Sequence, residues 1–277
     1  MLSSKSLKKV FFLLFVTFFL YFSSLGHGKE PPDSSTLEWK TLKSTLFGDA
    51  QIISSDTVID IDAPFRAEDA AIVPISIKSK IRQSPKRFIK KIYLLIDKNP
   101  TPVAGVFTIS QLAGKADIDT RVRLEEYTYV RAVAELNSGE LYMAHKFVRA
   151  SGGCSAPAGK DQEVALARLG KMKLRTESGI EIGKPARAQV MVSHPNFSGM
   201  QMDQVTRLYV PPRFVKEIEI FHSEKKLLTA KLDFAISENP NIRFFFTPTG
   251  EDYLKATVLD SENVTFEKVL AVQSQGN

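Results

Sequence analysis

The feature of this sequence that most constrains its fold is the short-period alternation of apolar and polar residues that recurs along most of the chain. Ile59 and Ile61, for example, alternate with Asp60 and Asp62, as in a β-strand with one buried face. The pattern predicts strands over 57–62, 71–77, 88–96, 103–109, 117–124, 127–135 and 141–149, and over 186–193, 215–221, 227–232, 242–247, 253–260 and 264–272. Short strands with little helix between them predict an all-β protein built from two β-sandwiches.

The N-terminus is typical of an export signal. Three lysines up to Lys9 precede an apolar run over 10–22, and small residues follow at 24–26. The run is short for a membrane span and suits a signal peptide over 1–28, with an uncleaved anchor as the alternative. After it, Leu37, Trp39, Leu42, Leu46 and Phe47 form a helical stripe, which predicts a short amphipathic helix.

Charge and cysteine content restrict the function further. The formal net charge is +6, and it falls to +3 without the three lysines of the signal region. No Lys/Arg cluster is interleaved with aromatic residues in the way that a nucleic-acid interface requires, so such an interface is not expected. The chain has one cysteine and therefore no intramolecular disulfide, so its domains must be held by their hydrophobic cores.

That cysteine, Cys154, lies in a Gly-, Ser-, Ala- and Pro-rich stretch between the two β-rich halves. Gly152 and Gly153 precede it and Ser155 follows it, which predicts a thiol on a flexible arm. In an exported protein, an unpaired cysteine indicates an intermolecular partner or a reactive thiol. The expected organisation is a signal peptide at 1–28, a sandwich at 37–150, an arm at 151–162 and a second sandwich at 163–277.

Other interpretations of the chemistry are weaker. A buried, inert cysteine and an exposed thiol with no role are both open alternatives. A Cys/His hydrolase would need His145 or His194 beside Cys154, and an arm is a poor platform for such a pair. The histidines have no ligand-like spacing, so neither a metal nor a cofactor is expected. The basic run at 86–91 favours a solvated strand edge, or less often a docking site for an acidic partner.

Several separate motifs resemble one known family. Three stretches of the second half resemble SoxZ: 188–195 (Ala-Gln-Val-Met-Val-Ser-His-Pro), 212–218 (Pro-Arg-Phe-Val-Lys-Glu-Ile) and 236–240 (Ile-Ser-Glu-Asn-Pro). The first half resembles SoxY through 63–74 (Ala-Pro-Phe-Arg-Ala-Glu-Asp-Ala-Ala-Ile-Val-Pro) and the Gly-Gly-Cys that ends at Cys154. The fused form resembles the SoxYZ-like carriers associated with quinoprotein (PQQ-dependent) dehydrogenases.

The resemblance implies two immunoglobulin-like β-sandwich domains in tandem, in a periplasmic carrier that is not an enzyme. It also implies that Cys154 is the attachment point for sulfur-type intermediates, with Gly152, Gly153 and Ser155 in the carrier arm. The implied partners are c-type cytochromes, Sox-type enzymes or a quinoprotein dehydrogenase, and a dimer through Cys154 is possible. One departure is that the arm is internal, because the two-chain carrier has its cysteine at the C-terminus of SoxY. The alternative is a non-catalytic accessory module for a quinoprotein dehydrogenase or its cytochrome c.

Overall fold

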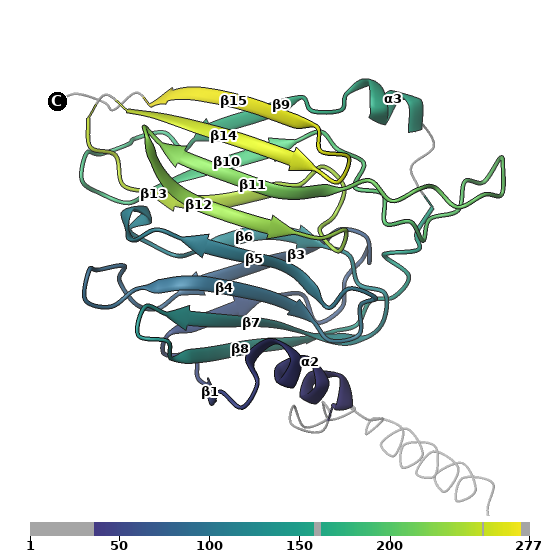
Figure 1. Ribbon diagram of the computed structural model, residues 1–277, viewed down its shortest axis with the longest axis horizontal. Helices are drawn as coiled ribbons and strands as arrows, with labels where there is room; N and C mark the ends of the chain where they lie inside the picture. The colour runs from purple at the N-terminus through teal and green to yellow at the C-terminus, as the bar shows by residue number, and fades with distance from the viewer. Residues whose placement is uncertain (1–35, 158–161, 251, 273–277) are drawn as a thin grey trace, which may run out of the picture. The chain divides into compact units, whose positions relative to one another are not determined.

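The computed structural model describes residues 36–157, 162–250 and 252–272 (Figure 1). The predicted signal peptide therefore lies outside the described residues. The first half contains α2 (Leu37–Phe47), β1 (Ile52–Ser54), β2 (Ile59–Asp62), β3 (Val73–Ser79), β4 (Ile89–Ile96), β5 (Val103–Ile109), η3 (Gln111–Ala113), β6 (Ile118–Val122), β7 (Thr128–Leu136) and β8 (Leu141–Val148). The second half contains α3 (Gln162–Ala167), β9 (Met172–Thr176), β10 (Ala186–Val192), β11 (Val215–His222), β12 (Lys225–Leu232), β13 (Asn241–Phe246), β14 (Asp252–Asp260) and β15 (Thr265–Val272).

The strand and helix predictions are confirmed, and the structure adds elements that the sequence did not indicate. Each predicted strand is present, and the predicted helix is α2. The additional elements are β1, β9, α3 and the 3-10 turn η3. Strand β9 lies in a stretch with the composition of a polar loop, because Lys173 and Arg175 face solvent while Leu174 alone is buried. One buried position is too weak a signal for a period-two pattern.

The strands form two sheets, and both sheets run through both halves. The nine-stranded sheet has the order β1-β8-β7-β4-β5-β12-β11-β14-β15, and the six-stranded sheet has the order β2-β3-β6-β13-β10-β9. Figure 1 shows the larger sheet in front of the smaller one. Most neighbours pair antiparallel, and the short β1 pairs parallel with β8. The all-β class and the sandwich architecture predicted from the sequence are thereby confirmed.

The two halves meet edge to edge along a seam. In the larger sheet, β5 pairs with β12 from Gly105–Leu232 to Ile109–Leu228. In the smaller sheet, β6 meets β13 at one pair, Asp119 and Arg243. Because an unpaired sheet edge exposes a row of backbone donors and acceptors, each half protects edges that the other would leave open. The sequence predicts two sandwiches, but it does not indicate that they share both sheets.

One hydrophobic core lies between the sheets and continues across the seam. It joins buried residues of the first half, such as Ile92 and Phe107, to buried residues of the second, such as Ile220 and Phe246. Apolar burial of this kind contributes roughly 25 cal/mol per Å², so a continuous core strongly favours the joined form. A smaller cluster of buried apolar side chains around Trp39 packs α2 against the outer face of the larger sheet.

A buried arginine ties the loops of the two halves together at one end of the seam. Arg123 follows β6 and is 2% exposed. Its Nη1 donates to the carbonyl oxygens of Asn196 (2.6 Å), Phe234 (2.9 Å) and Ile236 (3.1 Å). Its Nη2 donates to the carbonyl oxygen of Pro195 at 3.3 Å. All four acceptors belong to the second half, so this side chain of the first half fixes two loops of the second.

Replacing this arginine by methionine is expected to destabilise the protein strongly. Arg123→Met keeps most of the apolar stem but leaves several buried carbonyls without donors, and each unsatisfied group costs about 1–3 kcal/mol. We expect the free energy of unfolding in urea to fall by about 3 kcal/mol or more. The exposed Arg243→Met on the same sheet is the control, with an expected change below about 0.5 kcal/mol. Equal effects of the two substitutions would contradict the role given to Arg123.

Candidate functional site: the docked cysteine

The residues around Cys154 form a segment, 151–157, that is docked against the body of the protein. Just before it, the Arg149 backbone N–H donates to the Phe65 carbonyl at 2.8 Å. Within it, the Gly152 N–H donates to the Glu125 carbonyl at 2.9 Å, and the Gly153 N–H donates to the Leu124 carbonyl at 2.8 Å. The docked segment and the residue just before it therefore lie against two loops of the first half. One loop precedes β3 and the other follows β6.

The carboxylate of Glu125 holds the tip of the docked segment. Its Oε2 accepts hydrogen bonds from the backbone N–H groups of Cys154 (2.9 Å) and Ser155 (3.2 Å). Its Oε1 accepts a hydrogen bond from the Ser155 hydroxyl at 2.8 Å. Hydrogen bonds to an ionised acceptor are roughly twice as strong as neutral ones. From the second half, the Ser198 hydroxyl donates to the Cys154 carbonyl at 2.6 Å, so both halves build the site.

The glycine pair before the cysteine fits this docked position closely. Gly152 has φ +78°, in the left-handed region that side chains other than glycine adopt rarely. At Gly153, an added Cβ would lie 2.0 Å from the carbonyl oxygen of Ala70 and 2.8 Å from that of Leu124. The docked segment therefore requires Gly152 for its backbone conformation and Gly153 for its close packing, whether or not the two glycines also permit movement.

The Cys154 thiol is buried, with 0% exposure. Burial raises the pKa of the thiol to about 12; the negative charges of Glu125 and Asp233 act in the same direction, and the positive charge of Arg123 opposes them. Since the thiolate is the nucleophile, the docked cysteine is neutral and unreactive at ordinary pH. Any reaction at this sulfur needs the docked segment to leave its site.

The prediction of an exposed thiol on a free arm is wrong for this structure. It rests on the absence of apolar neighbours in the sequence around Cys154, but the segment is held by backbone and carboxylate hydrogen bonds instead. Gly152, Gly153 and Ser155 all lie beside Cys154 as predicted, and all three contribute to docking. The sequence did not indicate the roles of Arg123, Glu125 and Ser198. The role of Cys154 in covalent attachment stays a prediction.

The histidines considered as catalytic partners have other surroundings. His145 lies on β8, with its ring 5.4 Å from that of Tyr129. His194 is buried after β10, where its Nδ1 accepts a hydrogen bond from the Asn196 backbone at 3.0 Å. Burial lowers the pKa of His194 to about 4, against the opposing charge of Asp260. A neutral imidazole that shapes a turn is a structural group, not a general base poised near neutral pH.

Two further expectations concern metals and the basic run. Within the described ranges, no group of three or more His, Cys, Asp or Glu side chains is arranged to hold a metal ion. In the same part of the chain, no helix is long and apolar enough to cross a membrane.

The basic run at 86–91 leads into β4, which lies between β7 and β5 and is not an edge strand. There Lys90 and Lys91 approach Glu135 at 3.9 and 3.7 Å, which reduces the local positive charge.

Comparison with known protein families assigns the two halves. The model of the sulfur oxidation protein SoxY matches residues 43–154, and the model of the sulphur oxidation protein SoxZ matches residues 174–271. The chain belongs to the SoxYZ family, with both partners fused in one polypeptide. The SoxY match ends at Cys154 itself, so the cysteine of this fused chain lies where its SoxY region ends.

Solved structures show only weak similarity. The sulfur carrier protein SoxY from Chlorobium limicola f thiosulfatophilum is 22% identical, with 41% of this chain and 91% of that chain covered and a TM-score of 0.34. A superoxide reductase (neelaredoxin) from Ignicoccus hospitalis is 12% identical, with 43% and 90% covered and a TM-score of 0.28. Fibronectin(III)-like modules of CbhA from Clostridium thermocellum are 9% identical, with 78% and 94% covered and a TM-score of 0.24. No curated protein matches the sequence, so the assignment rests on the two family models.

Membership of this family indicates a carrier or accessory function in sulfur oxidation. The predicted absence of catalytic activity agrees with it, because SoxY is a carrier and SoxZ an accessory component. The family context indicates Sox-type enzymes as partners. In the SoxYZ arrangement of this chain, the seam is the contact between the SoxY and SoxZ regions, and the docked cysteine lies at one end of it.

Removing the Glu125 carboxylate is expected to expose the thiol. Glu125→Ala deletes the acceptor of three hydrogen bonds, and each bond to a charged group contributes roughly 1.5–3 kcal/mol. We expect the rate of Cys154 alkylation by iodoacetamide at neutral pH to rise by about tenfold or more. The control is Glu126→Ala, which removes the neighbouring exposed carboxylate and its 3.8 Å contact with Lys98. If both variants react like the parent protein, Glu125 does not hold the segment.

The pH dependence of alkylation tests the state of the thiol. Docking raises the pKa of Cys154, so protonated thiol favours the docked form and deprotonation weakens docking as pH rises above the ordinary thiol value of about 8.5. The parent protein should therefore show a rate that still increases at about pH 10. In Glu125→Ala the rate should level off nearer the ordinary value. A plateau near that value in the parent protein would contradict burial of the thiol.

Proposed function

We propose that this chain is an exported covalent carrier in sulfur oxidation, with Cys154 as the attachment point for a sulfur intermediate. The observation that carries the proposal is the position of the only cysteine. It lies at the end of the SoxY match, in a site to which the SoxY and SoxZ regions both contribute hydrogen bonds. The proposed location is the periplasm, and the signal-like sequence of residues 1–28 supports it.

The proposed cycle has a docked and a released state. In the docked state the sulfur is shielded from solvent, which protects the free thiol from unwanted oxidation. In the released state the thiol regains an ordinary pKa and forms thiolate more readily. The thiolate attacks the outer sulfur of a persulfide on a partner enzyme. A new S–S bond forms at Cys154, the S–S bond of the partner breaks, and the partner leaves as its thiolate.

The proposed partners are periplasmic redox enzymes. Sox-type enzymes fit the family, and c-type cytochromes or a quinoprotein dehydrogenase fit the resemblance of the fused form. A second copy of this chain is a further partner for the released thiol. Its thiolate attacks the inner sulfur of a persulfide on Cys154 of the other copy, a disulfide forms between the two Cys154 residues, and hydrosulfide leaves. The docked state opposes that dimer, because the sulfur is not accessible.

A second candidate function is an accessory module that uses the cysteine little. Its support is the full burial of Cys154 and the network that holds it. In that case the seam and the outer faces of the sheets would be recognised by a quinoprotein dehydrogenase or its cytochrome c. The two functions differ in whether the sulfur itself is needed.

Substitution of the cysteine, with mass analysis, separates the two functions. Cys154→Ser removes the sulfur with little change in volume, so folding and partner binding should persist while sulfur transfer in the native host is lost. The control is Ser151→Ala, which changes an exposed serine of the same segment and keeps the thiol. In parallel, the parent protein should be purified from the periplasmic fraction without reductant, and its intact mass and Cys154 peptides measured. A reducible mass addition on Cys154 is expected, and its size identifies the cargo. A uniformly free thiol, with normal activity of Cys154→Ser, would favour the accessory module.

A further inference from the structure

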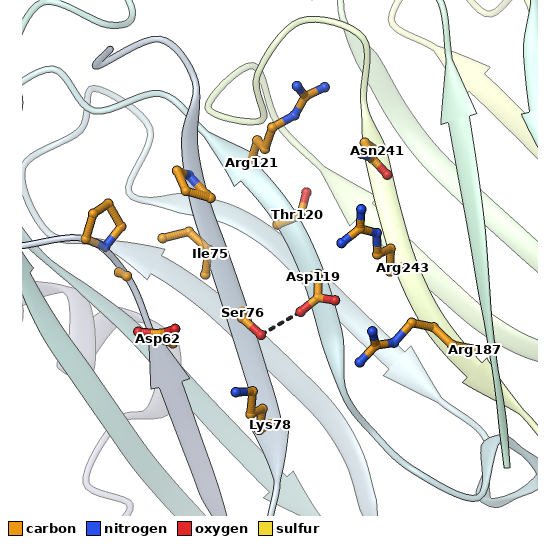
Figure 2. A pocket seen from close by; sticks show the side chains of 13 residues that line it. Asp62, Ile75, Ser76, Lys78, Asp119, Thr120, Arg121, Arg187, Asn241 and Arg243 are labelled. Carbon is orange, nitrogen blue, oxygen red and sulfur yellow. Dashed lines mark hydrogen bonds between the residues drawn. The ribbon is translucent and has the colours of Figure 1, made fainter. Parts of the chain in front are cut away.

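The outer face of the six-stranded sheet carries a groove that crosses the seam. Its volume is about 780 Å³, and strands β2, β3, β6, β13 and β10 all contribute to its lining. Figure 2 shows the side chains that line it. The charged members, which we call the charged groove, are Asp62, Lys78, Asp119, Arg121, Arg187 and Arg243.

The groove has more positive than negative groups, and its arginines come from three neighbouring strands. Arg121 lies on β6, Arg243 on β13 and Arg187 on β10, so the guanidinium groups span the seam between the SoxY and SoxZ regions. Figure 2 shows Arg187 extending from its strand toward the side of the groove where Asp119 lies. The Asp119 carboxylate itself accepts a 2.6 Å hydrogen bond from Ser76.

The lysine and the arginines of the charged groove have hydrogen-bond donors that no group accepts in the part of the chain that the structure describes. Among the described residues, Arg243 and Lys78 are exposed and have no ion-pair partner. Arg187 has one long ion pair, 3.4 Å, with the exposed carboxylate of Glu177, and its guanidinium lies 5.3 Å from the centre of the Phe245 ring. Arg121 donates through Nη2 to the Asn239 carbonyl at 3.2 Å, while its buried Nε has no hydrogen-bond partner in the described chain. The groove therefore presents donors that the protein does not satisfy.

The spacing of these groups suits an extended acidic peptide. Adjacent strands are about 4.8 Å apart, so three neighbouring strands place guanidinium groups over roughly 10 Å. Alternate residues of an extended chain are about 6.7 Å apart, which matches this span with two or three carboxylates. Arginine binds carboxylate in a bidentate manner, with geometric specificity. A single small oxyanion would fill little of a groove of this volume.

We propose that the charged groove binds an acidic, extended segment of a partner protein, whose carboxylates pair with Arg121, Arg187 and Arg243. The site goes beyond the proposed carrier function, since it does not require Cys154. It is nevertheless connected by contacts to the loops that surround Arg123. Arg121 is two residues before Arg123, and its acceptor residue, Asn239, also accepts a hydrogen bond from the His194 backbone. A partner bound in the groove would therefore be held beside the end of the seam where Cys154 docks.

Peptide binding to charge-reversal variants tests the proposal. The probe is fluorescein-labelled hexaglutamate, with hexaglutamine as the uncharged comparison, measured by anisotropy at low salt with the full chain. The groove variant is R187E/R243E. The matched control is K231E/K268E, which makes the same charge change at exposed lysines of the nine-stranded sheet. We expect binding of hexaglutamate alone, weakened about tenfold or more by R187E/R243E and less than about twofold by the control.

Three results would overturn the proposal. They are no binding by the parent protein, equal weakening by both double variants, and displacement of the peptide by inorganic sulfate at equal concentration. The neutral variant R187Q/R243Q should also weaken binding, and circular dichroism should show that it is folded, so misfolding is excluded as the cause. Because the groove variants keep Cys154, their Cys154 adduct can be measured separately. Loss of peptide binding with an intact adduct separates this site from the carrier function.

Discussion

The arrangement of this protein depends on one buried positive charge. Both Nη atoms of Arg123 donate to backbone carbonyls of the SoxZ region and not to a carboxylate. A buried guanidinium is costly unless its hydrogen bonds are well made, so the loops at 195–196 and 234–236 must stay in register with it. The same charge lies close enough to the Cys154 thiol to oppose the rise in its pKa. The contact between the two regions and the chemistry of the site are therefore linked through a single side chain.

The shared sheets explain how a chain with no disulfide keeps two regions together. The β5–β12 pairing and the continuous core bury surfaces that two separate sandwiches would expose. Covalent fusion adds a high effective concentration of one region for the other, so the seam does not depend on the concentration of two separate chains. The only cysteine has no intramolecular disulfide to make.

The sequence was sufficient for most strands because each of them has a local apolar signal, whereas β1 and β9 are too short or too polar to show one. It was sufficient for α2 for a similar reason, since Trp39 and Leu42 mark one face of the helix. It was not sufficient for the docked cysteine. Glu125 and Arg123 look like ordinary surface charges in the sequence, and their partners lie far away along the chain. Arg123, for example, contacts the Ile236 carbonyl, 113 residues on. Such contacts follow from the shared sheets, which no local pattern predicts.

The position of Cys154 between two regions that are both anchored in the same sheets limits how far its sulfur can travel. The flanking elements are β8, which ends at Val148, and α3, which begins at Gln162. An extended chain spans at most about 3.3–3.6 Å per residue, so the sulfur can move only about 20 Å from the end of β8. Because the polypeptide continues from Cys154 back to α3, the cysteine would enter a partner at the tip of a loop, with two backbone segments side by side. An enzyme that serves this chain therefore needs an open cleft wide enough for two backbones, and a narrow tunnel that admits a single free chain end would exclude it.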